Sequence, residues 1–296
     1  MSIYTGAQHH ESHSRCHHHW GGVHGASPAS PPGPTRPQTP RPGEKFIAAG
    51  ATGRSSGLVR MHYDTELDSR LAWESFHYFR NWKESVGGEC GFTRTGFIQL
   101  VSPKHEDALK TNVISAPTDR HPSLLITADD VKRLAPTMQT DDFTCAAYDP
   151  ESGYAMPSDT AAAFMNAARD KGARLIQGCT VTGVTLSGGK VTGVTTDQGH
   201  YSAPVVVNCA GAWADTLNKM VGLDLPYTTW RHDTMMVARP GVIGPSHPTV
   251  IDFAREMYFR PEGPLTLVGL EDGNPPARIP RHQHRLRPIR LRRTGH

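Results

Sequence analysis

The sequence predicts a mixed α/β protein, in which antiparallel hairpins are inserted between units of parallel-sheet type. Two observations predict this class. Between about residues 44 and 275, segments with helical periodicity alternate with short β-branched runs. Glycine pairs such as Gly188-Gly189 separate some of these runs and mark the turns of hairpins. A chain of 296 residues is long enough to bury one large core or two interleaved ones.

The first two helices are expected from apolar spacing and capping signals. Large apolar side chains recur at roughly helical spacing in residues 62–88, with Asp64 as a possible N-cap and Gly87 as the stop. Thr127 and Asp130 have the spacing of a capping box, which predicts the start of a second helix.

The alanine-rich residues 157–173 predict a third helix, with Ser158 as its N-cap and Gly172 as its end. A short fourth helix is expected near residues 213–220. Strands are expected in the β-branched and apolar runs at residues 96–101, 174–177, 179–187, 190–197, 203–211, 228–238, 248–252, 256–260 and 265–270.

The two ends of the chain differ from this body. Residues 28–42 contain seven prolines, which can sustain neither a helix nor a central strand. Residues 277–296 contain seven arginines and no acid, so the formal charge of +3 becomes 3 − 7 = −4 without them. We expect residues 1–43 and 276–296 to be disordered or poorly packed. No aromatic interleaving or recognised motif accompanies the arginines, so no nucleic-acid partner is expected.

Cysteine usage and hydropathy indicate the compartment. The five cysteines are odd in number and form no CxxC pair, and no secretory signal is present, so we expect a reducing, cytoplasmic location. No apolar run approaches the ~20 residues of a spanning helix, so no membrane span is expected.

Residues 50–60, GATGRSSGLVR, are the first candidate binding segment. Their small residues let backbone amides approach a ligand closely, and Arg54 offers a fork for phosphate. An ordinary surface turn is the alternative, and this segment alone favours it.

Two later segments are also candidates. Residues 205–215, VVVNCAGAWAD, combine a β-branched run with small residues, as in a buried parallel strand that ends at a cofactor. A core strand followed by a tight turn is the alternative. Residues 256–273 predict a hairpin that exposes Tyr258 and Arg260.

In this order and spacing, the segments resemble the D-amino-acid-oxidase-like superfamily of FAD-dependent oxidoreductases, in its sarcosine- and glycine-oxidase-like branch. The resemblance covers roughly residues 44–275. It implies an FAD-binding Rossmann-like domain interleaved with a substrate domain built on a mixed, largely antiparallel sheet, here incomplete. The FAD-binding parts would be about 44–65 and 158–222, and the substrate-domain parts about 66–157 and 223–275.

The resemblance also assigns residues to the cofactor. Glu44 stands where the family ends its second strand, the loop after it wraps the flavin, and the backbone near Val181 meets the adenine. The residues assigned to FAD are Gly22, Gly25, Glu44, Thr52, Arg54, Ser55, Ser56, Gly57, Val181, Cys209, Ala210, Gly211 and Trp213.

The first glycine motif of the family is incomplete here. Gly22 and Gly25 fit the second and third glycines of Gly-x-Gly-x-x-Gly, but Trp20 occupies the first and residues 17–19 are histidines. A reading frame one nucleotide later would turn these histidines into isoleucine or threonine and Trp20 into glycine. We therefore interpret both ends as out-of-frame sequence, with the family's last part of the substrate domain missing. The histidines have no structural-zinc spacing, and no metal site is expected.

The implied chemistry is hydride transfer to the flavin from the carbon next to an amine nitrogen, giving an imine that hydrolyses. The substrate would be a small amine or secondary amino acid, with Arg60 bidentate on its carboxylate and Tyr258 as a wall of the site. The alternatives are that Arg60 pairs with Asp64 and that Tyr258 packs in the sheet. Leu267 lies near where some relatives carry a lysine that helps the flavin react with oxygen, so a dehydrogenase is an open possibility.

Other points stay open from the sequence. The sequence identifies no catalytic residue and no electron acceptor. Whether this chain holds FAD is a separate question from which family it descends from. The alternative function is a non-catalytic metal- or anion-binding protein that uses the His-rich and Arg-rich ends.

Overall fold

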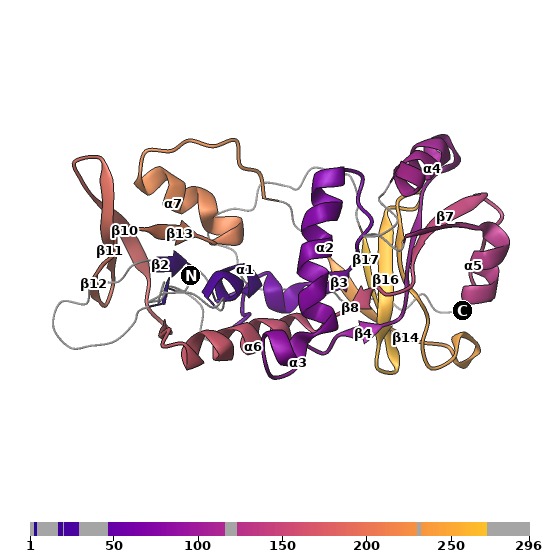
Figure 1. Ribbon diagram of the computed structural model, residues 1–296, viewed down its shortest axis with the longest axis horizontal. Helices are drawn as coiled ribbons and strands as arrows, with labels where there is room; N and C mark the ends of the chain where they lie inside the picture. The colour runs from indigo at the N-terminus through magenta and orange to yellow at the C-terminus, as the bar shows by residue number, and fades with distance from the viewer. Residues whose placement is uncertain are drawn as a thin grey trace, which may run out of the picture.

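The computed structural model describes residues 3–4, 17–19, 21–29, 47–115, 123–229 and 232–270. Figure 1 shows an elongated molecule: small sheets and α7 lie at one end, a group of helices lies in the middle, and a large sheet forms the other end. The described residues form a mixed α/β fold, as predicted.

A two-stranded parallel sheet lies next to the N-terminal helix. β2 (His17–His19) pairs in parallel with β13 (Val206–Asn208), and α1 (Val23–Ala26) follows with buried Gly25 and Ala26. α1 packs on α6 (Pro157–Asp170), as Figure 1 shows. Residues 17–19 and 21–29 thus contribute a strand and a helix to the described fold. Of the two expectations for residues 1–43, disorder or a remnant of the first FAD-binding unit, these segments favour the second. Strand pairing uses backbone groups, which histidine supplies as well as isoleucine does.

Small antiparallel sheets flank this pair. The Gly188-Gly189 turn joins the first two strands of a three-stranded sheet, and both glycines have the positive φ that a two-residue hairpin needs. The elements of this end are β1 (Ile3–Tyr4), β9 (Leu175–Ile176), β10 (Val181–Ser187), β11 (Lys190–Thr196), β12 (Gly199–Ser202) and α7 (Ala214–Met220).

A seven-stranded sheet forms the other end of the molecule, in the order β14-β17-β16-β15-β5-β7-β6. β15 and β5 are parallel, and every other neighbouring pair is antiparallel. Its strands are β5 (Phe97–Leu100), β6 (Leu124–Thr127), β7 (Cys145–Asp149), β14 (Thr234–Ala238), β15 (Thr249–Asp252), β16 (Met257–Glu262) and β17 (Leu265–Leu270).

Helices and one more small sheet complete the described fold. α4 (Glu106–Ser115) and α5 (Ala128–Leu134) pack on β7, whereas α2 (Glu66–Arg80) and α3 (Trp82–Ser85) lie in the middle of the molecule (Figure 1). The small sheet has the order β3-β8-β4, formed by Leu58–Val59, Gly153–Tyr154 and Thr93–Arg94. Among the described helices, none is long and apolar enough to cross a membrane.

The helix starts test the capping predictions. The capping box at α5 is confirmed: Asp130 N donates to Thr127 Oγ1 at 3.2 Å, and Thr127 N donates to Asp130 Oδ2 at 2.8 Å. Two other predictions of N-cap residues are wrong. Thr65 rather than Asp64 caps α2. α6 starts with Pro157 at its first turn, where the missing N–H costs nothing, so Ser158 lies inside the helix instead of capping it.

Candidate functional site

The carboxyl ends of the two parallel strands form the first part of the site. Ligands of α/β sheets bind beyond such strand ends. After β2 come Gly21 and Gly22, both buried, and Gly22 is the N-cap of α1. After β13 come Cys209, the fully buried Ala210 and Gly211, followed by the exposed Trp213. Small residues thus follow both strands where a ligand would need close access to the backbone.

The segment from Ile47 to Gly57 packs on the glycine turn. Ala48 N donates to Gly21 O at 2.9 Å, and Val23 N at the start of α1 donates to Thr52 Oγ1 at 3.1 Å. Gly53 N donates to Ala48 O at 2.8 Å, and a Cβ on Gly53 would lie only 2.3 Å from that oxygen. Only glycine fits at this position, so residue 53 fixes how the loop folds onto the strand ends.

The polar side chains of this loop serve the loop itself. Arg54, which we expected to offer a fork for phosphate, is exposed and donates from Nη1 to the carbonyls of Ala49 and Gly50. Gly57 N donates to Ser55 Oγ at 3.1 Å. Ser56 is buried and its carbonyl oxygen accepts from Arg260 Nε. The structure thus joins the predicted cofactor loop to the large sheet through a contact that the sequence did not predict.

Backbone and side-chain contacts also order the segment after β13. Asn208 Nδ2 donates to Ala214 O at 3.0 Å, and Ala210 N donates to Asn208 Oδ1 at 3.1 Å. Val181, which we expected near the adenine, is buried in one cluster with Ala210 and Leu217. The predicted residues of β10 and of the β13 end therefore share one small core.

The described residues fit the pyrophosphate end of a dinucleotide in their order: strand, glycines, helix start, and a second strand ending in small residues alongside. The fit departs from the pattern in the length of α1, which has four residues before a 3₁₀ turn. Trp20 and Glu44 lie outside the described residues. Gly22, Gly25 and the 52–57 loop are brought together through α1 and Thr52.

Arg60, the predicted carboxylate ligand, lies between the loop and the large sheet. Its Nη1 donates to Oε1 of Gln99 at 2.9 Å, and Gln99 is only 2% exposed. The guanidinium carbon lies 4.2 Å from the ring centroid of Tyr63 and 6.0 Å from those of Phe97 and Phe253. No carboxylate among the described residues pairs with Arg60, so the alternative pairing with Asp64 is not formed.

Tyr258 and its neighbour are buried rather than exposed. Tyr258 is 8% exposed and packs with Phe97 and Leu267, and its ring covers Gly269, where a Cβ would lie 2.1 Å from Cζ. Arg260 is 2% exposed. Our expectation that the hairpin exposes these two side chains is wrong. Tyr258 and Arg260 project from the same face of β16, where Tyr258 packs in a cluster and Arg260 lies against Ser56 and the ring of Tyr154. Tyr258 packs in the sheet, as the alternative had it, and a role next to substrate stays a prediction.

Asp149 is a residue of the site that the sequence analysis missed. It is 1% exposed, and its Oδ2 accepts from the backbone N–H groups of Met61 and His62, each at 3.1 Å. Its Oδ1 accepts from Ser123 Oγ. The carboxylate therefore holds the backbone that follows Arg60 against the end of β7. The partners lie 87 and 88 residues away, so no local pattern could have indicated them.

Metal binding gains no support from the described residues. They contain no group of three or more His, Cys, Asp or Glu side chains that could hold a metal ion. The side chains of residues 17–19 and the arginine-rich residues 276–296 lie outside the described part, and the comparisons below give no support to the metal- or anion-binding alternative.

Comparison with known proteins identifies the family. Residues 43–292 match the family model described as "DAO: FAD dependent oxidoreductase", which begins where we expected and extends beyond residue 275. Human mitochondrial sarcosine dehydrogenase is 27% identical over 236 residues, which cover 77% of this chain and 26% of that protein. The chain thus spans about a quarter of the length of this relative.

Solved structures agree on the fold. L-proline dehydrogenase from P. horikoshii has a TM-score of 0.72 at 23% identity, covering 88% of this chain and 69% of that chain. Glycine oxidase from Geobacillus kaustophilus has a TM-score of 0.69 at 21% identity, covering 86% and 70%. These neighbours support the predicted mixed α/β fold class, whereas the division of the chain into FAD-binding and substrate-domain parts stays a prediction. Because the family model matches most of its length, the chain belongs to the DAO family of FAD-dependent oxidoreductases.

Proposed function

We propose that this chain binds FAD and oxidises the C–N bond of a small amine that carries a carboxylate, such as a secondary amino acid. The observation that carries the substrate class is Arg60. Its guanidinium is held by a neutral amide and aromatic rings, with no carboxylate partner among the described residues. Such a group retains its full positive charge and unused donors for an anion.

The cofactor half of the proposal rests on the family and on the strand-end arrangement. Gly22 and Gly25 at α1, with the 52–57 loop beside them, would receive the pyrophosphate and the flavin edge. Glu44, Val181 and the segment from Cys209 to Trp213 would serve the ADP half. When bound, FAD supplies the acceptor for the hydride that leaves the carbon next to the amine nitrogen.

The chain's own residues would orient the substrate. Arg60 would bind the carboxylate, and Gln99 would hold one edge of the guanidinium so that the other donors face the ligand. The rings of Tyr63, Phe97 and Phe253 surround the guanidinium and keep water from part of its surface. Exclusion of water lowers the local dielectric constant and strengthens the ion pair with the substrate.

Replacement of Arg60 by alanine tests this proposal. A hydrogen bond to a charged group contributes about 1.5–3 kcal/mol, so we expect KM for sarcosine to rise about 10- to 100-fold in the FAD-loaded protein. KM for the amide of sarcosine, which has the same shape without the carboxylate, should change little. Equal changes for both substrates would remove Arg60 from the carboxylate role.

The electron acceptor is part of the proposal as well. Leu267 is buried in the core of the large sheet and supplies no cation. We propose that an acceptor other than oxygen reoxidises the flavin. Turnover under nitrogen with an artificial dye should therefore exceed turnover in air without the dye, and the reverse would contradict it.

A further inference from the structure

The largest fully buried side chain among the described residues is that of an arginine. Arg260 lies on β16, inside the seven-stranded sheet, and is 2% exposed. Removal of a guanidinium from water is costly unless charged and hydrogen-bonding partners surround it. The partners of Arg260 therefore show which contacts offset the cost of burying its guanidinium.

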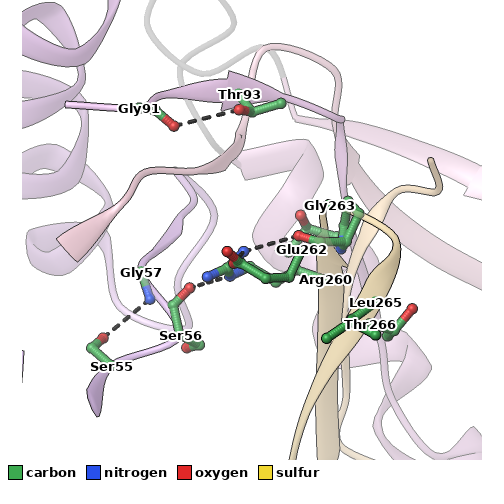
Figure 2. A network of polar contacts seen from close by, with 12 residues as sticks. Ser55, Ser56, Gly57, Gly91, Thr93, Arg260, Glu262, Gly263, Leu265 and Thr266 are labelled. Atoms are coloured by element: carbon green, nitrogen blue, oxygen red, sulfur yellow. Dashed lines mark hydrogen bonds and ion pairs between the residues drawn. The ribbon is translucent and has the colours of Figure 1, made fainter. Parts of the chain in front are cut away.

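These partners come from two parts of the chain. Nη1 donates to the carbonyl of Pro261 at 2.9 Å and forms an ion pair with the carboxylate of Glu262. Nε donates to the carbonyl of Ser56, which is 204 residues away in sequence. Figure 2 shows the guanidinium lying between Ser56 and Glu262, and its carbon lies 4.2 Å from the ring centroid of Tyr154 on β8. The planar fork of arginine can reach both partners at once.

Apart from Arg54, which donates to the carbonyls of Ala49 and Gly50, the loop that Arg260 reaches consists of small residues. At its start, Thr52 binds Val23 N. At its end, Gly57 has φ +65° and lies so close to Ala155 that a Cβ would be 2.1 Å from Ala155 O. Ala155 N also donates to Gly57 O at 2.9 Å. The end of the loop is thus held between β8 and the guanidinium on β16.

We propose that Arg260 is a positioning residue, which fixes the end of the 52–57 loop on the seven-stranded sheet. The loop and the sheet then keep one relative geometry, although they lie on chain segments about 200 residues apart. The inference rests on the proposed function in one respect, namely that FAD is the ligand of this loop.

Hydrogen exchange in the full chain without added FAD tests the positioning role. The amides of Gly53, Ser55 and Gly57 are hydrogen-bonded within the loop or to its base, so their exchange reports opening of the loop. In Arg260→Met we expect exchange of these amides to rise about tenfold, the loss expected for one hydrogen bond to a charged group. Tm should also fall, since Glu262 loses its partner.

A double variant separates positioning from charge pairing. Arg260→Met with Glu262→Gln removes both charges and should recover Tm, because a buried pair is often replaceable by neutral groups. The loop should still exchange fast, since the bond to Ser56 is still missing. If the double variant restores loop protection together with Tm, Arg260 only stabilises the sheet and the inference is overturned.

Arg239 provides a matched control. It donates to the carbonyls of Leu265, Gly263 and Pro245, so it holds the same β16–β17 hairpin without contacting the loop. Arg239→Met should leave exchange of the loop unchanged. Equal loosening of the loop in this variant would also overturn the inference.

Titration with FAD completes the test. We expect Kd for FAD to rise about tenfold in both Arg260 variants and to stay unchanged in Arg239→Met. Unchanged FAD affinity in the Arg260 variants would overturn the link between loop order and cofactor binding. If the unsubstituted chain binds no FAD, the proposed function fails, while hydrogen exchange still decides whether Arg260 fixes the loop.

Discussion

Replacement of Gln99 by glutamate tests whether Arg60 keeps its positive charge for a substrate. Gln99 Oε1 accepts from Arg60 Nη1 at 2.9 Å in a site where Gln99 is buried. The substitution is nearly isosteric, but it places a negative charge at this position. Two unit charges about 4 Å apart attract by about 4 kcal/mol at an effective dielectric constant near 20, so the new carboxylate would pair firmly with Arg60.

A substrate carboxylate then competes with an internal one. The charge-assisted part of its binding, about 1.5–3 kcal/mol, should be lost, which corresponds to a rise of about 10- to 100-fold in KM for sarcosine. KM for the amide of sarcosine should change little, because the amide carries no charge for Arg60 to bind. Steady-state kinetics of the FAD-loaded protein at pH 8, where the glutamate is ionised, measure both values.

Gln99→Met is the matched control for this experiment. It removes the acceptor without adding a charge, so Arg60 loses its orientation but keeps its charge. We expect a smaller rise in KM for sarcosine than in Gln99→Glu. If glutamate and methionine raise KM equally, or if the amide of sarcosine is affected as strongly as sarcosine, Arg60 does not meet the carboxylate.

Two further outcomes concern stability. Gly53→Ala should destabilise the fold by about 1–3 kcal/mol in urea unfolding, because its Cβ would meet the backbone oxygen of Ala48. Gly241→Ala, where a Cβ would have open space around it, should be near neutral, and equal effects would refute the contact. Burial lowers the pKa of His247 below its usual 6.5, so its stabilising contribution is complete above about pH 6.5 and is lost as the pH falls through the lower pKa of the folded state. Unfolding free energy should therefore fall between pH 7 and 5, and His247→Gln should flatten that slope; an unchanged slope would exclude His247 as the cause.

Local signals predicted local structure well. The Gly188-Gly189 hairpin and the α5 capping box are both present, because each depends on residues within a few positions of one another. Periodicity also predicted α2, although Leu67 and Leu71, which contributed to the pattern, are 66% and 60% exposed. Spacing of apolar residues therefore indicated the helix without indicating which side chains it buries.

The site was predictable in part. Arg60 and the 52–57 loop were found from composition and from the family resemblance. Arg60 follows the loop by three residues in the same segment. The contacts that hold them were not predictable. Asp149 binds the backbone after Arg60, and Arg260 binds Ser56, from 87 and 204 residues away. Such contacts follow from sheet topology, which periodicity does not specify.

The N-terminal region shows a different limit of prediction from the sequence. We expected residues 1–43 to be disordered or poorly packed because of the proline run at 28–42. β2 nevertheless pairs with β13, and Gly21 accepts from Ala48 N at 2.9 Å. Backbone hydrogen bonds and buried glycines do not need apolar side chains, so side-chain pattern alone underestimates how far the folded body extends.

The most direct test of the account is FAD binding by the purified chain, measured by quenching of flavin fluorescence on titration. We predict a single saturable FAD site, a rise in Tm with FAD concentration as linkage requires, and weaker binding in Gly53→Ala, which displaces the 52–57 loop. A chain that unfolds cooperatively yet shows neither saturable quenching nor a shift in Tm would contradict the central claim that this fold holds FAD.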